Sequence, residues 1–130
     1  MTLEQYRNNL KPYDQRIFDE MYDSFVGTVI QLMVEADVTD DTITTVISNH
    51  WDISTDEIMS ILHNAKINHA VFLLEKYMKQ NGYTDSMIKD FMQKNIVKTR
   101  LRNEPALLMQ GKKPEKIYKS VQPKKISMEK

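Results

Sequence analysis

The same helix boundary occurs three times in this chain. In each copy a hydroxyl residue follows an apolar residue, an isoleucine stands four positions later, and an acidic residue lies between them. The three hydroxyl residues are Thr39, Ser54 and Thr84. Such a side chain accepts hydrogen bonds from the exposed N–H groups of a first helical turn, where acids also complement the helix dipole. The apolar pair has the spacing of a hydrophobic staple, so each copy predicts a helix start.

Each boundary also predicts where the preceding helix ends. Asp37, Asp52 and Gly82 stand two positions before the three hydroxyl residues. Helices commonly end at a residue in the left-handed conformation, which glycine adopts freely and aspartate tolerates. We therefore expect left-handed residues at these three positions.

The boundaries divide the chain into helices. We expect them over residues 12–36, 40–50, 55–80 and 85–102, followed by a short helical turn over 105–110. The chain has only 3 Gly and 4 Pro, and three of the prolines lie at or after Pro105. Few glycines or prolines therefore interrupt helices within the first hundred residues. The fold expected is all-α, a single compact bundle of four to five helices with one long N-terminal helix, one short helix and two longer ones.

Apolar spacing predicts which helix faces are buried. Apolar residues recur every four positions on the first helix, which we therefore expect to be largely buried. They are Tyr13, Ile17, Met21, Phe25, Val29 and Met33, and Phe18, Tyr22, Val26 and Ile30 lie beside them. The helix over 85–102 is expected to bury Met87, Ile88, Phe91, Met92 and Ile96.

The composition changes after residue 102. We expect residues 1–102 to form the helical body and residues 103–130 to form a short helix and a flexible basic tail. The tail is rich in lysine and too polar to bury its own backbone. Its apolar anchor is expected at Ile117, Tyr118 and Val121.

The sequence argues against several classes of function. It contains no Cys, which excludes disulfides and thiolate chemistry and is compatible with a cytoplasmic location. No apolar run is long enough to span a bilayer, so no membrane role is expected. No catalytic, nucleotide-binding or metal-binding motif occurs, and His63 and His69 face different directions on one helix. We expect a non-enzymatic protein without cofactor or metal.

Charge is divided along the chain although the total is neutral. Residues 17–65 hold ten carboxylates and no Lys or Arg. Up to Ile88 there are 14 acidic and 6 basic residues, and from Lys89 to Lys130 there are 12 basic and 4 acidic residues. Such a division produces fields of opposite sign, which select partners of opposite charge.

The basic half leads to the first functional hypothesis. It is an accessory or regulatory protein whose helical body binds a protein partner, while its C-terminal segment contacts nucleic acid or nucleoprotein. Lysine acts as a point charge on phosphates and reads little sequence, so binding would be sequence-tolerant. The residues expected to carry it are Lys94, Lys98, Arg100, Arg102, Lys112 and Lys113.

The acidic half leads to a second hypothesis, a protein-directed inhibitor of the anti-CRISPR kind that phages and mobile elements encode. Its acidic surface would imitate a phosphate backbone. The residues expected there are Asp19, Glu20, Asp23, Asp40, Asp41, Asp56 and Glu57. Several of these acids also have a structural explanation as residues of first helical turns. A third hypothesis is a homo-oligomer in which the basic tail of one subunit covers the acidic face of another.

Overall fold

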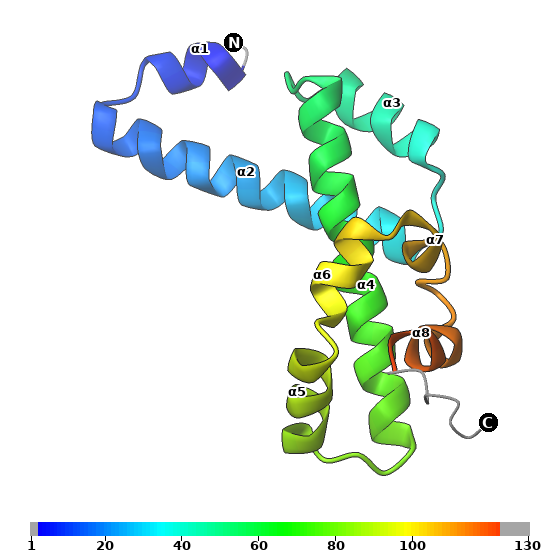
Figure 1. Cartoon of the computed structure of the whole chain (residues 1–130). Helices are drawn as coiled ribbons and strands as arrows, with labels where there is room; N and C mark the ends of the chain where they lie inside the picture. The colour runs from blue at the N-terminus through cyan, green and yellow to red at the C-terminus, as the bar shows by residue number, and fades with distance from the viewer. Residues whose placement is uncertain (1–2, 123–130) are drawn as a thin grey trace, which may run out of the picture. The chain divides into compact units, whose positions relative to one another are not determined.

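The computed structural model describes residues 3–122, and within that range it is all-α, with eight helices and no strand (Figure 1). The helices are α1 (Leu3–Asn8), α2 (Pro12–Glu35), α3 (Asp40–His50), α4 (Thr55–Gln80), α5 (Asp85–Lys94), α6 (Val97–Asn103), α7 (Pro105–Leu108) and α8 (Pro114–Val121). The expected helical class is confirmed. The expected count of four to five helices is wrong, because α1 and α8 were not foreseen and the helix over 85–102 is divided into α5 and α6.

The three predicted helix starts are confirmed. The backbone N–H of Thr42 donates to Thr39 Oγ1 at 3.3 Å, and that of Met87 donates to Thr84 Oγ1 at 3.1 Å. At the third boundary the N–H of Glu57 donates to Ser54 Oγ at 3.2 Å. Each bond satisfies an N–H group that the first helical turn leaves exposed.

Two of the three predicted left-handed helix ends are confirmed. Asp37 has φ 62° and Gly82 has φ 90°. The N–H of Val38 donates to the Met33 carbonyl at 3.0 Å, and Tyr83 bonds to Met78 in the same way. This is the bond pattern of a Schellman end. The expectation for Asp52 is wrong, because α3 ends at His50 and the next residue, Trp51, is extended, with φ −131°, while Asp52 has no positive φ.

Contacts group the chain into two compact units, which differ from the division expected at residue 102. Unit 1 comprises Met1–Ile61 and unit 2 comprises Leu62–Lys130. Unit 1 has 12 acidic and 3 basic residues, for a net charge of −9, and unit 2 has 15 basic and 6 acidic residues, for +9. The two units therefore carry opposite net charges, although the boundary between them lies at residue 61 and not at residue 88.

In unit 1 a small core forms at the C-terminal part of α2. Val26 and Ile30 of α2 are fully buried, as are Ile43 and Ile47 of α3 and Ile58 of α4. The expectation that α2 is largely buried is wrong. Its 24 residues extend about 36 Å, whereas the 11 residues of α3 extend about 16 Å and cover a part of it. Several apolar residues of α2 are instead exposed, namely Tyr13, Ile17, Met21, Phe25 and Leu32.

The N-terminal half of α2 contacts α1. Arg7 donates to both carboxylate oxygens of Asp19, through Nε at 2.6 Å and Nη2 at 2.7 Å. The rings of Tyr6 and Phe18 lie 5.8 Å apart between centroids. These hydrogen bonds from Arg7 lower the pKa of Asp19 below its ordinary value.

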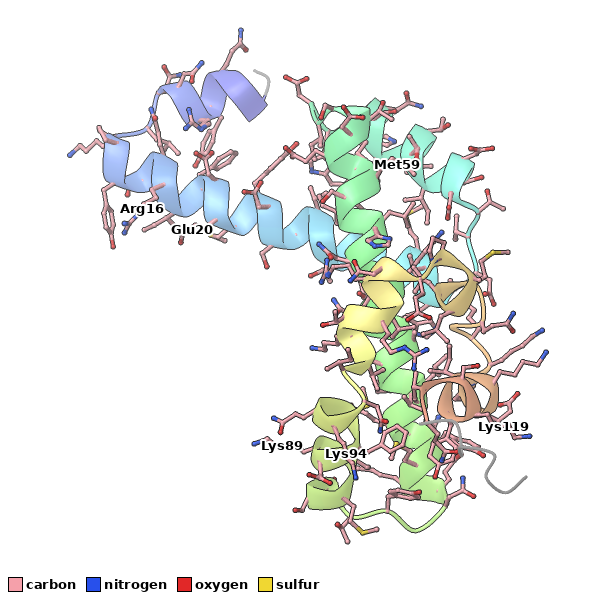
Figure 2. All side chains as sticks on the ribbon, in the orientation of Figure 1. Arg16, Glu20, Met59, Lys89, Lys94 and Lys119 are labelled. Carbon is pink, nitrogen blue, oxygen red and sulfur yellow. The ribbon has the colours of Figure 1, made fainter. Side chains whose placement is uncertain are left out.

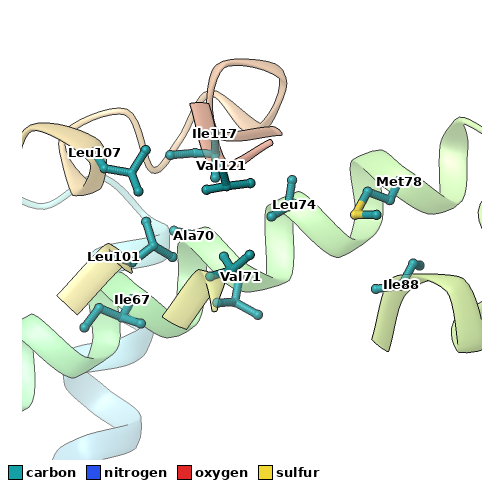
Figure 3. Packing of buried hydrophobic residues seen from close by; sticks show 11 residues of the cluster. Ile67, Ala70, Val71, Leu74, Met78, Ile88, Leu101, Leu107, Ile117 and Val121 are labelled. Atoms are coloured by element: carbon teal, nitrogen blue, oxygen red, sulfur yellow. The ribbon is translucent and has the colours of Figure 1, made fainter. Parts of the chain in front are cut away.

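In unit 2 the core lies against one face of α4 (Figure 3). Figure 1 shows α5 and α8 on either side of α4. Ile117 and Val121 of α8 are buried, and the ring of Tyr118 stacks on that of Phe91 with centroids 5.2 Å apart. The predicted anchor is thus confirmed, but residues 114–121 are a packed helix and not a flexible tail. Residues 123–130 of the expected tail lie outside the described residues.

Replacing Ile117 with Ala tests the role of α8. The variant should lose about 2–5 kcal/mol of unfolding free energy, because a fully buried side chain leaves a cavity. Chemical denaturation followed by circular dichroism measures this loss. The matched change Lys116→Ala, at an exposed site of the same helix, should cost less than about 0.5 kcal/mol. Equal stability of the two variants would contradict the packed position of α8.

Replacing Asp19 with Asn tests the contact between α1 and α2. A carboxyl whose pKa is lower in the folded state stabilises that state above its unfolded pKa, and the effect is lost as pH falls through the folded pKa. In the wild type, the contact between α1 and α2 should therefore weaken as pH falls below the ordinary pKa of Asp. In Asp19→Asn the contact should already be weaker at neutral pH, and this loss should not depend on pH. NMR shifts of the α1 amides report both, and unaltered shifts in the variant would refute the assignment.

A lysine-rimmed groove as the candidate functional site

The helix expected over residues 85–102 is interrupted at Asn95 and Ile96. Asn95 is 9% exposed, and its Nδ2 donates to the Phe91 carbonyl at 3.0 Å, which ties the side chain to the last turn of α5. Asparagine favours such local bonds over helix continuation. Ile96 then adopts the left-handed conformation, with φ 42° and ψ 49°. The expectation of one continuous helix is therefore wrong.

The interruption changes which residues are buried. Ile96 is 55% exposed, whereas Val97 and Leu101 of α6 enter the core. Met87, which was also expected to be buried, is half exposed. A β-branched residue in the left-handed region is strained, and such strain persists where the surrounding structure determines it, often at binding sites. Ile96 is thus a strained apolar residue directed to the surface.

A groove of about 840 Å³ lies beside this residue and is formed by α4, α5 and α6. Its apolar lining includes the buried residues Val71, Ile88 and Val97 and the half-buried Met92. Phe72 of α4 also lines it and is 59% exposed. A concave apolar surface with exposed aromatic and aliphatic side chains is typical of a docking site.

Lysines from all three helices surround the groove. They are Lys76, Lys79, Lys89 and Lys98, and all four are exposed. Glu75 and Asp85 are the acidic lining residues, and Asp85 accepts an ion pair from Lys79 at 3.1 Å. An ion pair this exposed contributes little and exchanges readily with another partner. The rim of the groove therefore favours negatively charged ligands.

The basic residues predicted from sequence do not form one surface. Lys98 lies on the groove, whereas Lys94 and Arg100 border a smaller hollow of about 330 Å³ together with residues 120–122. Lys112 and Lys113 precede α8. Figure 2 shows Lys89 on α5 and Lys119 on α8 pointing away from each other. The basic charge of unit 2 is distributed around it rather than concentrated.

Both predicted arginines are engaged within unit 2. Arg100 Nε donates to Glu104 at 2.8 Å and its Nη1 donates to the Ser120 carbonyl at 3.2 Å. These bonds lower the pKa of Glu104 and raise that of Arg100. Arg102 Nη1 donates to Asn64 Oδ1 at 2.9 Å. These guanidinium groups hold helices together, which reduces their availability to phosphates.

The acidic residues predicted as a second surface all lie in unit 1. Asp40 and Asp41 occupy the first turn of α3, and Asp56 and Glu57 that of α4, as their capping explanation requires. Asp19 is bound to Arg7. Glu20 and Asp23 are exposed on α2, and Figure 2 shows Glu20 beside Arg16.

Sequence reasoning missed five of the residues that characterise the groove. Phe72, Lys76 and Lys79 follow one another at the i, i+4 and i+7 positions of one α4 face, and this mixed spacing was the available signal. Lys89 and Ile96 are seven positions apart, but the interruption at Asn95 determines their placement. The groove combines three helices and so has no linear motif.

Two further observations concern residues 3–122. No cluster of three acidic or histidine side chains could hold a metal ion there. No helix in that range combines the length and apolar character needed to cross a membrane. Comparison of the chain with family models, curated proteins and solved structures found no match.

Replacing Ile96 with Gly tests the strain at the groove. Glycine adopts the left-handed conformation without a steric penalty, so the variant should be more stable than the wild type by about 1 kcal/mol. The matched change Thr99→Gly, within α6, should be less stable by about 1 kcal/mol. Urea unfolding gives both values. Destabilisation by both changes would refute the strained conformation of Ile96.

Proposed function

We propose that this is a non-enzymatic interaction protein whose unit 2 binds an acidic amphipathic helix of a protein partner in the lysine-rimmed groove. The observation that carries the proposal is the combination in one groove of two exposed apolar side chains, Phe72 and Ile96, with four surrounding lysines. An amphipathic helix binds such a groove through anchors at i, i+3, i+4 and i+7. Its acidic flanks would lie against the lysines.

The dimensions of the groove suit a short helical segment. Its lining on α4 extends from Val71 to Lys79, a rise of about 12 Å, and its lining on α5 and α6 extends from Asp85 to Thr99. A partner helix of two to three turns spans that distance. A large apolar residue of the partner could contact Phe72 and Ile96 together, which is the kind of central contact that dominates binding energy.

Charge supports an acidic partner. Unit 2 carries a net charge of +9, and the groove has twice as many lysines as carboxylates on its rim. Exposed charges mainly accelerate association and select among partners, while the apolar contacts supply most of the affinity. Binding should therefore weaken with salt but persist at physiological ionic strength.

The strain at Ile96 supports the same surface. The left-handed conformation of this residue costs about 1–2 kcal/mol and keeps an apolar side chain exposed. A residue selected for stability alone would be glycine at this position. The presence of isoleucine at this position is explained if its side chain contacts a partner.

Sequence-tolerant nucleic-acid binding is a second candidate function, favoured by the net charge of unit 2 and by the exposed Lys94, Lys98 and Lys113. Lysines distributed around the unit would contact phosphates at several places. Because Arg100 and Arg102 are bound within the unit, this function would depend on lysine alone. The affinity for nucleic acid should then depend on the total charge of unit 2 and not on the lysines of any one surface.

A charge reversal at the groove distinguishes the two functions. The double change Lys89→Glu and Lys98→Glu should weaken binding of a fluorescent, glutamate-flanked amphipathic helical peptide on the order of tenfold. The matched change Lys116→Glu and Lys119→Glu, on exposed positions of α8, alters net charge equally and should leave that affinity nearly unchanged. Fluorescence anisotropy measures both.

The same variants are measured against a DNA duplex. Equal loss of peptide affinity in the two variants would show that net charge alone governs binding and would refute the groove. Duplex binding at physiological salt that falls equally in both variants, without peptide binding, would support the second candidate function instead.

A further inference from the structure

A second exposed apolar surface lies on α2 of unit 1, although the ring of Phe25 also lies 6.1 Å from that of Trp51, centroid to centroid. Tyr13, Met21 and Phe25 are 65%, 68% and 59% exposed, and Ile17 between them is 36% exposed. These four residues, termed the α2 face, follow one another every four positions and extend about 18 Å along the helix. Large apolar residues in a continuous row on a helix indicate an interaction surface.

Acidic residues surround the α2 face. Asp14, Glu20 and Asp23 are exposed on the same helix, with Arg16 as the basic residue among them. Arg7 is not available to neutralise these acids, because it is bound to Asp19. Unit 1 as a whole carries −9, so a second unit 1 would be repelled from this face. Pairing of two α2 helices with each other is therefore electrostatically unfavourable.

Helix α2 is thus an acidic amphipathic helix, which is the class of ligand proposed for the groove of unit 2. We infer that the occupant of the lysine-rimmed groove is α2 of a second copy of this chain, an inference that rests on the proposed function of the groove. Three successive residues of the α2 face, at i, i+4 and i+8, extend about 12 Å, which equals the length of the groove lining on α4. Its acidic neighbours would lie against Lys76, Lys89 and Lys98 of the other copy. The acidic unit 1 of one copy would then contact the basic unit 2 of the other.

This contact is heterologous, because each copy contributes a different surface. Every copy has one α2 face and one groove, so association is either reciprocal, which closes a dimer, or sequential, which extends a chain. Both forms require the two surfaces to be intact. They also predict that association weakens as salt screens the attraction between charges.

A mixing experiment tests the inference with the full chain. The first variant, Glu20→Lys with Met21→Lys, alters one residue of the α2 face and one of its acidic neighbours, both of which are exposed. The second, Phe72→Asp with Lys89→Glu, alters the groove at two exposed positions. Each variant alone should weaken self-association on the order of tenfold or more, measured by light scattering across concentration. An equimolar mixture should regain a heterodimer, because the α2 face of the second variant fits the groove of the first.

Failure of this inference differs from failure of the proposed function. Self-association that survives in the groove variant but not in the α2 variant would mean that α2 pairs with itself. Loss in the groove variant alone would assign the groove another occupant. A wild type that is monomeric at all concentrations would exclude a second copy. Each of these results overturns the inference. Binding of the glutamate-flanked peptide, measured by fluorescence anisotropy, tests independently whether the groove binds a helix. Circular dichroism confirms that both variants are folded.

Discussion

Unit 2 depends on one buried face of α4. Ile67, Ala70, Val71, Leu74 and Met78 follow one another at helical spacing and are all buried, and residues from α5 to α8 pack against them (Figure 3). Burying apolar side chains on this face is the main favourable term available to the short helices, since helices of four to ten residues are unstable in isolation. The groove exists because α5 and α6 follow this face and diverge at Ile96.

Tyr118 links the parts of this assembly. Its ring lies within 6.1 Å of the rings of Tyr77, Tyr83 and Phe91, centroid to centroid, and its hydroxyl is hydrogen-bonded to that of Tyr83. The contact joins α8 to α4, to the connection after it and to α5. The position of α5, and with it one wall of the groove, is thereby coupled to a helix more than 20 residues later in the chain.

The sequence predicted features that depend on a few adjacent residues. Thr39, Ser54 and Thr84 cap helices because hydroxyl groups and helix N–H groups are complementary wherever they meet. The burial of α2 was not predictable, since apolar spacing identifies a face but not whether the same chain covers it. The order of α8 was missed because its lysines dominate the composition, although Ile117, Tyr118 and Val121 pack it against the core. Of the groove lysines, Lys98 alone was anticipated as a binding residue, because the groove joins α4 to α5 and α6, whose placement depends on the turn at Ile96.

The contact between Trp51 and Phe25, whose ring centroids are 6.1 Å apart, has a practical consequence. Trp51 is the single tryptophan of the chain and belongs to unit 1, whereas Tyr77, Tyr83 and Tyr118 cluster in unit 2. Indole emission therefore reports on the acidic unit alone. Emission that changes at a different denaturant concentration from the helical circular dichroism signal would reveal that the two oppositely charged units unfold as separate cooperative blocks.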